Sequence, residues 1–541
     1  MHSPRHPLQI GAAVAVLLAG TSVLLFWLFA GGGDQASGVT SLDSTLGSIT
    51  LPSTTATTPL TATTTTSSTT TTTIPDDPLH LWSDARLVGE PYGTAVEGLL
   101  TFRGNPTRTY YGEGPVPESP TLKWRFPDAA MCSVSTDLGV TSTWCGNGWT
   151  GQPVIWERPD GVTEMIFGAY DRKLHFVDAE TGIPTRSPIL TGDIIKGTPT
   201  IDPDGFPIVY FGSRDNKVRA VALDRSDAIV IWDFEVCLPK PSCPEEAANV
   251  DVGGRWNDDW DSSPLIVNDY MFEGSENSIY YIFRLNRGYD SLGLVTIAPE
   301  VVFQMDTWND ELMAAIGPTY PAVSVENSTA MYEGRIYFAN SGGRVFGLDI
   351  TDIESGDVEI VFDYWVGDDV DATIFVDEQG YLYVSAEYER YLPRARELGQ
   401  LIKLDPYNRD DPWVWGMYSL NEPPAKGGLW STPALGDGVI YAVTHKGTLI
   451  VVDQETGAEL WYFTLGYGSW SSPVIVDNQL IVAANDGLLR RFDLADPREP
   501  RLVWTFKVGT GNLEATPAVW KGMIYIGGRD GFMYAIGELD G

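Results

Sequence analysis

Residues 429–461 read LWSTPALGDGVIYAVTHKGTLIVVDQETGAELW. Runs of β-branched and aromatic residues alternate here with turn residues, which is typical of consecutive antiparallel strands. Asp453 stands four residues before Gly457. The carboxylate of such an Asp accepts backbone N–H bonds two or three residues on, and Gly supplies the left-handed position that closes the turn. The stretch therefore predicts a β unit that starts at Pro433 and ends with an outer strand carrying Trp461.

The same layout recurs along the chain with a spacing of about fifty residues, as in propeller blades. The inner strand of each copy is expected after a small residue and Pro, at Pro153, Pro199, Pro264, Pro321, Pro433, Pro473 and Pro517, with Asp371-Ala372-Thr373 where an eighth would be. Tight hairpin turns are expected at residues 171–172, 215–216, 485–487 and 529–531. An outer-strand Trp, such as Trp415 or Trp504, is expected to fill the space between neighbouring sheets.

The last copy supplies three strands before the sequence ends at Gly541. Residues 122–126, LKWRF, have the Trp-bearing outer-strand pattern and precede the first complete copy. Pairing this strand with the last sheet closes the ring and removes exposed sheet edges. The predicted fold is therefore all-β: an eight-bladed propeller of four-stranded antiparallel blades over residues 76–541, closed by residues 122–126.

The repeat resembles the pyrroloquinoline-quinone (PQQ) repeat, whose pattern is a Pro-initiated inner strand, then A/V-x-D-x-x-T-G, then an outer-strand Trp. Residues 431–461 and 153–182 match best, and Phe102-Arg103-Gly104-Asn105 resembles the F-R-G box that often introduces such propellers. The family includes quinone-dependent dehydrogenases as well as cofactor-free propellers such as the lipoprotein of the bacterial outer-membrane barrel-assembly machinery. The resemblance implies the fold and leaves both functions open.

Two departures place the chain closer to the cofactor-free members. Quinoprotein alcohol dehydrogenases hold the cofactor between a Trp and a vicinal disulfide, with Ca²⁺ and a catalytic Asp nearby. This chain has no adjacent Cys pair and no C-x-x-C-H for haem. Its cysteines, Cys132, Cys145, Cys237 and Cys243, are expected to form two disulfides. Local pairing of Cys132 with Cys145 and of Cys237 with Cys243 is the first choice among three connectivities, and a zinc site is the alternative.

The N-terminal segment predicts a membrane anchor. Residues 8–30 contain no charge and would span roughly 34 Å as a helix. Arg5 precedes them and acidic residues follow, so the tail 1–7 is expected in the cytoplasm and the rest outside. A cleaved signal peptide is the alternative. Residues 31–75 are Ser/Thr-rich and are expected to form a disordered stalk.

The formal net charge of −37 argues against nucleic acid as a partner. Such a charge favours cations or basic surfaces, and solubility at an exposed location explains it equally well.

Several features are expected on one rim of the propeller, at the mouth of its central channel. Four tryptophans stand three or four residues before an inner-strand Pro and either plug the channel or stack on a ligand: Trp149, Trp260, Trp430 and Trp470. Two D-D-x-D runs either bind Ca²⁺ or form a solvated acidic rim. Their acidic residues are Asp258, Asp259, Asp261, Asp368, Asp369 and Asp371. Residues 386–400 interrupt the fifth blade and bring Arg390, Arg394 and Arg396 to the rim, as an anchor for a partner or as partners of neighbouring acids.

Two functions fit these patterns. The first is a membrane-anchored, extracytoplasmic propeller that binds a protein or cell-envelope component through this rim without catalysis and without a cofactor. The alternative is a PQQ- and Ca²⁺-dependent oxidoreductase in which one of the rim tryptophans stacks on the quinone and Asp259 or Asp261 lies near the metal.

Overall fold

The computed structural model describes residues 87–93, 95–137, 140–148, 151–236, 259–317, 323–421 and 423–539. All of them belong to one compact unit, Thr73–Gly541. The expected tail, membrane helix and stalk, residues 1–75, lie outside the described residues. Within the described ranges, none of the helices is long and apolar enough to cross a membrane.

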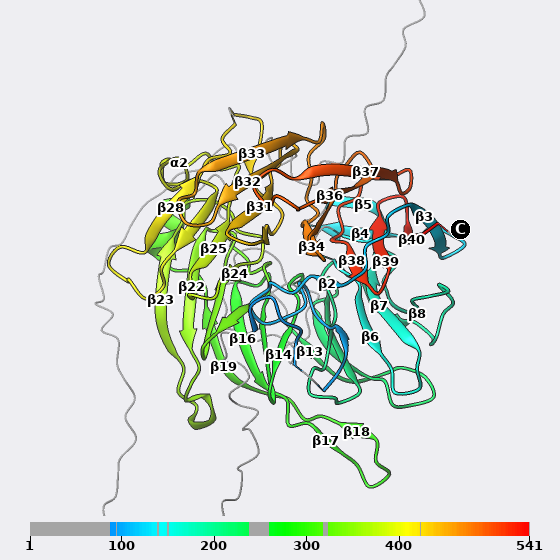
Figure 1. Cartoon of the computed structure of the whole chain (residues 1–541). Coiled ribbons are helices and arrows are strands. Elements are labelled where there is room, and N and C mark those ends of the chain that lie inside the picture. Colours follow the sequence, from blue (N-terminus) through cyan, green and yellow to red (C-terminus); the bar gives the residue numbers. More distant parts are fainter. Residues whose placement is uncertain are drawn as a thin grey trace, which may run out of the picture. The chain divides into compact units, whose positions relative to one another are not determined.

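Eight blades of four antiparallel strands follow one another around a ring, and two of these sheets gain one further short strand, so the predicted eight-bladed propeller is confirmed (Figure 1). Blade 1 consists of β6 (Val154–Glu157), β7 (Thr163–Ala169), β8 (Lys173–Asp178) and β9 (Ile189–Leu190). Blade 2 consists of β10 (Thr200–Ile201), β11 (Ile208–Ser213), β12 (Lys217–Ala222) and β13 (Ile229–Glu235). Blade 3 consists of β14 (Leu265–Val267), β15 (Tyr270–Gly274), β16 (Ile279–Arg284) and β19 (Glu300–Asp306).

The next blades repeat this order. Blade 4 consists of β20 (Ala330–Tyr332), β21 (Arg335–Ala339), β22 (Arg344–Asp349) and β23 (Glu359–Trp365). Blade 5 consists of β24 (Phe375–Val376), β25 (Leu382–Ser385), β27 (Leu401–Leu404) and β28 (Trp413–Met417). Blade 6 consists of β30 (Ala434–Leu435), β31 (Val439–Val443), β32 (Thr448–Asp453) and β33 (Glu459–Thr464). Blade 7 consists of β34 (Val474–Val476), β35 (Gln479–Ala483), β36 (Leu488–Asp493) and β37 (Arg501–Lys507).

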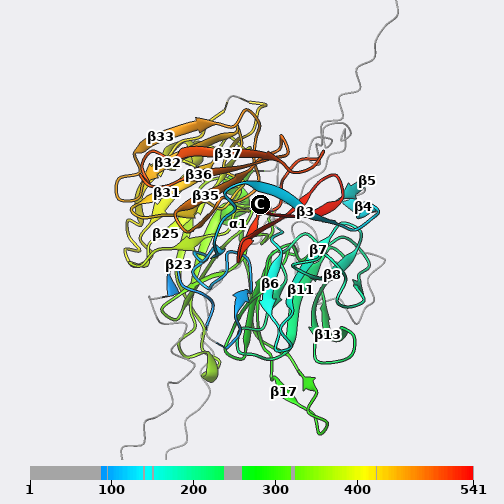
Figure 2. The ribbon, with the colours of Figure 1, turned by 45° about the vertical axis from the view of Figure 1, so that its right-hand side comes forward.

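Blade 8 is built from both ends of the propeller. Its strands are β38 (Ala518–Trp520), β39 (Met523–Gly528), β40 (Phe532–Glu538) and β3 (Pro120–Phe126), and β3 lies beside β40 in both views (Figures 1 and 2). The strands β3 and β40 pair antiparallel, with Leu122 opposite Ile536 and Phe126 opposite Met533. The expected closure by residues 122–126 is therefore confirmed, and the strand starts two residues earlier.

The Asp-Gly turns connect the third and fourth strands of a blade and contact the neighbouring blade. Asp453 Oδ1 accepts hydrogen bonds from Thr456 N at 2.9 Å and Thr456 Oγ1 at 2.8 Å. Gly457 has φ +73°, and a Cβ there would stand 2.6 Å from the indole of Trp415 in blade 5. Trp415 Nε1 donates to Gln454 O at 3.2 Å. The outer-strand Trp of one blade thus covers the turn of the next, as predicted.

A belt of hydrogen bonds encircles the channel and links each blade to the next. In most blades the residue two places before the inner strand carries a hydroxyl that accepts the backbone N–H of its counterpart in the preceding blade, at 2.7–3.4 Å. We call these residues the hydroxyl belt: Thr198, Ser263, Ser328, Thr373, Thr432, Ser472 and Thr516. Gln152 completes the ring, because its Nε2 donates to Pro517 O at 2.9 Å and Thr516 N donates to Gly151 O at 3.0 Å.

The belt corrects one predicted anchor. Pro321 was expected to start the inner strand of blade 4, but β20 begins at Ala330 and Ser328 holds the belt position. Thr329 therefore stands where six other copies have Pro and blade 5 has Ile374. Pro321 itself lies outside the described residues.

The segment around the F-R-G box plugs the channel, and it lies at the centre of the ring in Figure 1. Arg103 and Arg108 are fully buried. Arg103 donates to Pro433 O at 2.6 Å and Pro473 O at 2.9 Å, and Arg108 donates to Thr329 O at 2.8 Å. On either side, β1 (Gly98–Leu99) pairs with β6, and β2 (Gly112–Glu113) pairs with β38.

Several insertions leave the ring. Toward the channel mouth lie the hairpin β4 (Cys132–Asp137) and β5 (Val140–Cys145), helix α1 (Asp310–Ile316), and the blade 5 insertion with β26 (Glu387–Tyr388) and α2 (Pro393–Leu398). β26 pairs with β29 (Gly427–Gly428). At the opposite ends of the strands lie a 3-10 turn (Ile353–Ser355) and the projecting hairpin of β17 (Gly288–Tyr289) and β18 (Val295–Thr296) (Figures 1 and 2).

Candidate functional site

A second ring of side chains lies beside the hydroxyl belt. Alternate residues of an extended segment point the same way, so the residues two places before the belt residues share one direction. We call this set the mouth ring: Lys196, Asp261, Glu326, Asp371, Trp430, Trp470 and Glu514. A pocket is lined by Glu326, Asp371 and Trp430 together with the belt hydroxyls Ser328, Thr373, Thr432 and Ser472, and by Phe102 of the plug and Ala372. The mouth ring thus opens onto a polar pocket above the plug.

The first D-D-x-D run is held by cations. Asp259 Oδ2 accepts from Arg214 Nε at 2.5 Å. Asp261 contacts Lys196 Nζ, which lies 3.8 Å from Glu276 Oε1. One ligand atom from each of Asp259, Asp261 and Glu276 lies within 4.8 Å of the others, all three side chains being buried. Asp258 lies outside the described residues.

The second run lies near the first, with Glu326 between them. Arg390 lies 3.5 Å from Asp368 Oδ1 and 3.4 Å from Asp369 Oδ2. Burial raises the pKa of Asp369 to about 8, and the charges of Glu389 and Glu326 add to the rise against the attraction of Arg390. Glu326 lies close enough to Asp261 of the first run, and to Asp369 and Asp371 of the second, for these charges to shift one another's pKa. Whether these carboxylates hold Ca²⁺ stays a prediction.

Glu326 and Asp371 are acidic residues of the mouth ring without a cationic partner among the described residues. Neither forms an ion pair with any residue that the structure describes, whereas Asp261 pairs with Lys196. Burial raises the pKa of Glu326, and it raises that of Asp371 well above its ordinary value with the help of Asp369 and Glu326. Both side chains keep part of their surface accessible because they line the pocket.

Two of the four predicted tryptophans form an aromatic wall at the mouth. The rings of Trp430 and Trp470 are stacked with centroids 5.0 Å apart, and His445 lies 4.5 Å from Trp430. Trp470 Nε1 lies 3.3 Å from His445 Nδ1. Burial, then the charge of Lys426, lowers the pKa of His445 to about 4, so this ring is neutral at pH 7.

Trp260 does not reach the mouth. It is fully buried, packs against Tyr281 and Phe234, and donates from Nε1 to Asn216 O at 3.1 Å. It stands three places before its belt residue, whereas Trp430 and Trp470 stand two places before theirs. An odd offset points the side chain sideways into the seam between blades 2 and 3. Trp149 lies outside the described residues.

The three arginines of residues 386–400 differ in their surroundings. Arg390 is buried between Asp368 and Asp369, so it ties the insertion to the mouth. Arg394 donates to Tyr364 Oη at 2.8 Å and lies 3.2 Å from Glu397. Arg396 is exposed and contacts the Tyr388 hydroxyl. Internal pairing with acids therefore applies to Arg390 and Arg394. That these arginines contact a partner stays a prediction.

The cysteine prediction is confirmed where it can be followed. Cys132 and Cys145 face each other across β4 and β5 and form a disulfide with a Cα–Cα distance of 4.1 Å. Cys237 and Cys243 lie outside the described residues, so their pairing stays a prediction.

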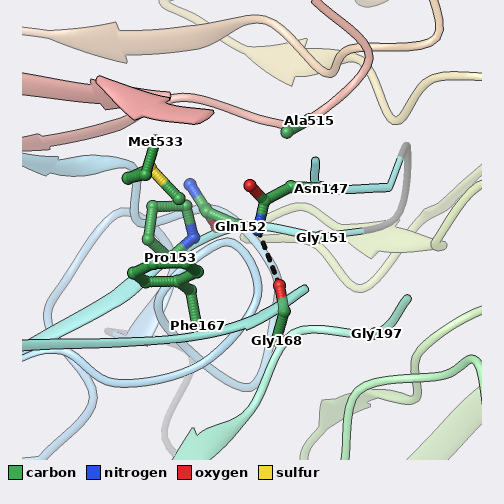
Figure 3. A pocket seen from close by; sticks show the side chains of 9 residues that line it. All are labelled: Asn147, Gly151, Gln152, Pro153, Phe167, Gly168, Gly197, Ala515 and Met533. Atoms are coloured by element: carbon green, nitrogen blue, oxygen red, sulfur yellow. Dashed lines mark hydrogen bonds between the residues drawn. The ribbon is translucent and has the colours of Figure 1, made fainter. Parts of the chain in front are cut away.

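A second, smaller pocket lies at the seam between blades 1 and 8 (Figure 3). Asn147 crosses it and donates from Nδ2 to Gly168 O at 2.6 Å. Its other lining residues are Gly151, Gln152, Pro153, Phe167, Gly197, Ala515 and Met533. None of these side chains is ionisable, so we assign the pocket no chemical role.

Part of the repeat region matches a known protein family. The family described as "Outer membrane protein assembly factor BamB" matches residues 399–541, which span blades 6 to 8 and part of blade 5. This part of the propeller therefore resembles the PQQ-like repeat that the sequence predicts. No curated protein matches the chain.

Solved structures resemble this PQQ-like propeller in fold. Quinohemoprotein alcohol dehydrogenase from Comamonas testosteroni has a TM-score of 0.54 and 12% identity, over 85% of this chain and 84% of that one. BamB from Moraxella catarrhalis has a TM-score of 0.37 and 12% identity, over 77% of this chain and 99% of that one. The computationally designed Ika8 protein has a TM-score of 0.44 and 11% identity, over 69% of this chain and 92% of that one. At these identities the likeness concerns the fold alone.

The mouth of the PQQ-like propeller does not fit a tricarboxylate quinone. The polar pocket is lined by the carboxyl groups of Glu326 and Asp371, and no Lys or Arg is among its described lining residues, so it offers an anionic ligand no opposite charge. The nearby cations Lys196 and Arg390 are engaged by Asp261, Asp368 and Asp369. A third cation, Lys426, lies with its Nζ 4.7 Å from the ring centroid of Trp430 and pairs with Glu389. One face of Trp430 is covered by Trp470. The Asp259, Asp261 and Glu276 cluster has oxygen ligands suited to Ca²⁺, but Lys196 Nζ stands among them.

Sequence reasoning missed Glu326, Glu276 and Lys196. Glu326 precedes Ser328 as Asp371 precedes Thr373, so the aligned copies contain the signal. Taking Pro321 as the anchor of blade 4 moved Glu326 out of register. Glu276 comes from the turn between β15 and β16, and nothing in its local sequence separates it from an ordinary exposed turn residue.

Proposed function

We propose that this chain is a single-pass membrane protein whose PQQ-like propeller lies outside the cytoplasm and binds a protein or a cell-envelope component. The binding surface is the face that carries the mouth ring. The apolar residues 8–30 supply the anchor in this proposal. The disulfide between Cys132 and Cys145 supports an oxidising compartment, because such bonds persist outside the cytoplasm.

The observation that carries the proposal is the asymmetry between the two faces of a sealed ring. Arg103 and Arg108 close the channel, so a ligand that enters the mouth stays at that face. The disulfide hairpin and residues 386–400 both rise beside the mouth and enlarge it. Long insertions around one mouth of a rigid scaffold are the usual place for binding residues.

The test is photo-crosslinking of the full-length chain in its native membrane, with charge-reversed variants. Arg394→Glu with Arg396→Glu changes the insertion at the mouth, where Arg396 is exposed. Arg498→Glu is the matched control, because Arg498 lies in the loop between β36 and β37 at the opposite ends of the strands and its side chain is 58% exposed.

We expect a crosslinked partner that is lost in the first variant and retained in the control. Recovery of the same partners from both variants would contradict binding through this face.

A further inference from the structure

The hairpin of β17 and β18 projects from the ring at the ends of the strands opposite the mouth (Figures 1 and 2). Leu292 in its tip is 81% exposed, a larger fraction than for any other large apolar residue that the structure describes. Tyr289 at the start of the tip is 55% exposed. Asp290 is the only charged residue between positions 288 and 299. The hairpin thus presents an apolar tip on this face.

The tip satisfies most of its own backbone N–H groups. Asp290 Oδ1 accepts hydrogen bonds from Leu292 N at 2.8 Å and from Leu294 N at 2.9 Å. Asp290 N donates to Leu294 O at 2.9 Å, and Gly293 N donates to Asp290 O at 3.0 Å. An unpaired N–H is costly to remove from water. These bonds therefore lower the cost of moving the tip into an apolar medium.

Contacts with blade 2 fix the direction in which the hairpin projects. Arg287 at its base pairs with Asp202 at 2.7 Å and with Asp204 at 2.8 Å, both from the turn between β10 and β11. Tyr289 stacks on Phe206 of the same turn, with ring centroids 5.5 Å apart. The apolar tip is therefore held out from the face by the fold of two blades.

The chain enters the propeller on the face that carries this hairpin. A Cβ added to Gly205, in the turn between β10 and β11, would stand 3.9 Å from that of Ala95. Glu97 O accepts the N–H of Glu157 at 2.9 Å, where β6 turns into β7. In an antiparallel blade these first turns and the connection that carries the hairpin lie at the same ends of the strands.

This point of entry matters because of what precedes it in the sequence. Residues 31–86 connect it to the apolar segment 8–30, which is the anchor in the proposed function. A flexible chain of this length has an end-to-end distance on the order of 40 Å. A tether of that length gives the bilayer a high effective concentration at this face, so a small apolar contact is sufficient for binding.

We propose that the tip of the β17–β18 hairpin inserts into the surface of the membrane, with Leu292 at the acyl boundary and Tyr289 among the headgroups. A Tyr ring suits this interface because one end is apolar and the other is polar. The inference rests on the membrane anchor of the proposed function and goes beyond it by assigning a second face to lipid. The mouth ring, at the opposite ends of the strands, stays free for a partner.

The experiment is photo-crosslinking of the full-length chain reconstituted in phosphatidylcholine liposomes. A zwitterionic lipid is used because a net charge of −37 is repelled by anionic headgroups. p-Benzoylphenylalanine is placed at Ser291, an exposed residue of the tip. The same group at Tyr467 is the control, because Tyr467 is 61% exposed in the loop between β33 and β34 at the mouth. We expect about tenfold more lipid adduct from position 291, since only the tip reaches the acyl boundary.

A charge at the tip tests the role of Leu292. Leu292→Asp adds a carboxylate beside Asp290 and is expected to lower the adduct from position 291 by about tenfold, because a charge stays in water. Ile183→Asp is the matched control, since Ile183 is 63% exposed in the turn between β8 and β9 at the same ends of the strands. We expect it to leave the adduct unchanged. Circular dichroism verifies that both variants are folded.

The proposal is overturned if position 291 gives no more lipid adduct than position 467, or if Leu292→Asp gives as much as Ile183→Asp. Adducts with protein in place of lipid also overturn it, because they assign the tip to a protein partner or a second copy. In these cases flotation of the chain with the liposomes shows that the anchor of the proposed function holds. A chain that does not float contradicts the anchor, and this inference with it.

Discussion

Thr432 Oγ1 accepts a hydrogen bond from the backbone N–H of Thr373 at 3.0 Å, across a sequence separation of 59 residues. The same bond recurs between most neighbouring blades, so the inner edges of the sheets are tied by side chains rather than by a shared sheet. Each belt hydroxyl satisfies a buried N–H that would otherwise be costly to bury.

Thr432→Val is expected to destabilise the domain by about 1–3 kcal/mol. Valine has nearly the shape of threonine but leaves the Thr373 N–H without an acceptor. Thr432→Ser keeps the hydroxyl and is expected to cost less than about 1 kcal/mol. Guanidinium unfolding of the two variants gives the comparison, and equal losses would show that the methyl packing matters more than the bond.

Arg103→Met is expected to destabilise the domain by about 2–4 kcal/mol, because the carbonyls of Pro433 and Pro473 lose their donors in a buried plug. Arg103→Lys is expected to recover less than half of this loss, since one ammonium lacks the fork that reaches both carbonyls. Arg498→Ala breaks an exposed pair with Asp453 and is expected to cost less than about 1 kcal/mol. Thermal unfolding followed by circular dichroism measures all three, and a loss for Arg103→Met no larger than that for Arg498→Ala would contradict the plug.

Gly457→Ala and Gly438→Ala distinguish the cost of a positive φ from the cost of a collision between the added Cβ and a neighbouring side chain. The residue has φ +73° and faces Trp415, with which an added Cβ would collide at 2.6 Å. Gly438 has a similar φ of +66° and nothing within 4 Å of an added Cβ. We expect Gly438→Ala to cost about 1 kcal/mol from backbone strain and Gly457→Ala to cost about 3 kcal/mol, because the second also displaces an indole. Equal costs in urea unfolding would show that the Trp415 contact yields freely.

Asp371→Asn is expected to change how stability depends on pH. Burial and the repulsion of Asp369 raise the pKa of Asp371 in the folded state, so its proton is bound more tightly there than in the unfolded chain. Its contribution to stability is full below the ordinary pKa of Asp and is lost as the pH rises through the raised pKa. The variant should therefore have a higher melting temperature than the native chain at pH 8, by about 2 °C, and no advantage near pH 4.

The control for the pH prediction has the opposite sign. Hydrogen bonds from Thr456 lower the pKa of Asp453, so its contribution is present at neutral pH and lost as the pH falls. Asp453→Asn should therefore lower the melting temperature at pH 8 and approach the native chain in acid. Parallel pH curves for the native chain and Asp371→Asn would refute the assigned role of Asp371.

Local rules explain why most of the fold could be predicted. Pro433, Asp453 and Gly457 act on residues only a few places away in the sequence, and similar residues recur in most copies of the repeat. Closure by residues 122–126 was predictable because an incomplete last blade and an unpartnered outer strand imply each other. The error at Pro321 arose where blade 4 lacks the proline signal and uses Ser328 and Thr329 instead.

The sequence by itself determined the number of blades, the closing strand, the turns and the acidic and aromatic composition of the rim, because these follow from periodicity and short-range chemistry. The tertiary structure alone decided which rim residues meet. In the folded domain Trp260 is buried between blades 2 and 3, and Lys196 pairs with Asp261. Glu326, Asp371 and Trp430 line one pocket. The physical reason is that side-chain direction depends on an offset of one residue from the belt, and the belt exists only once all eight blades have closed.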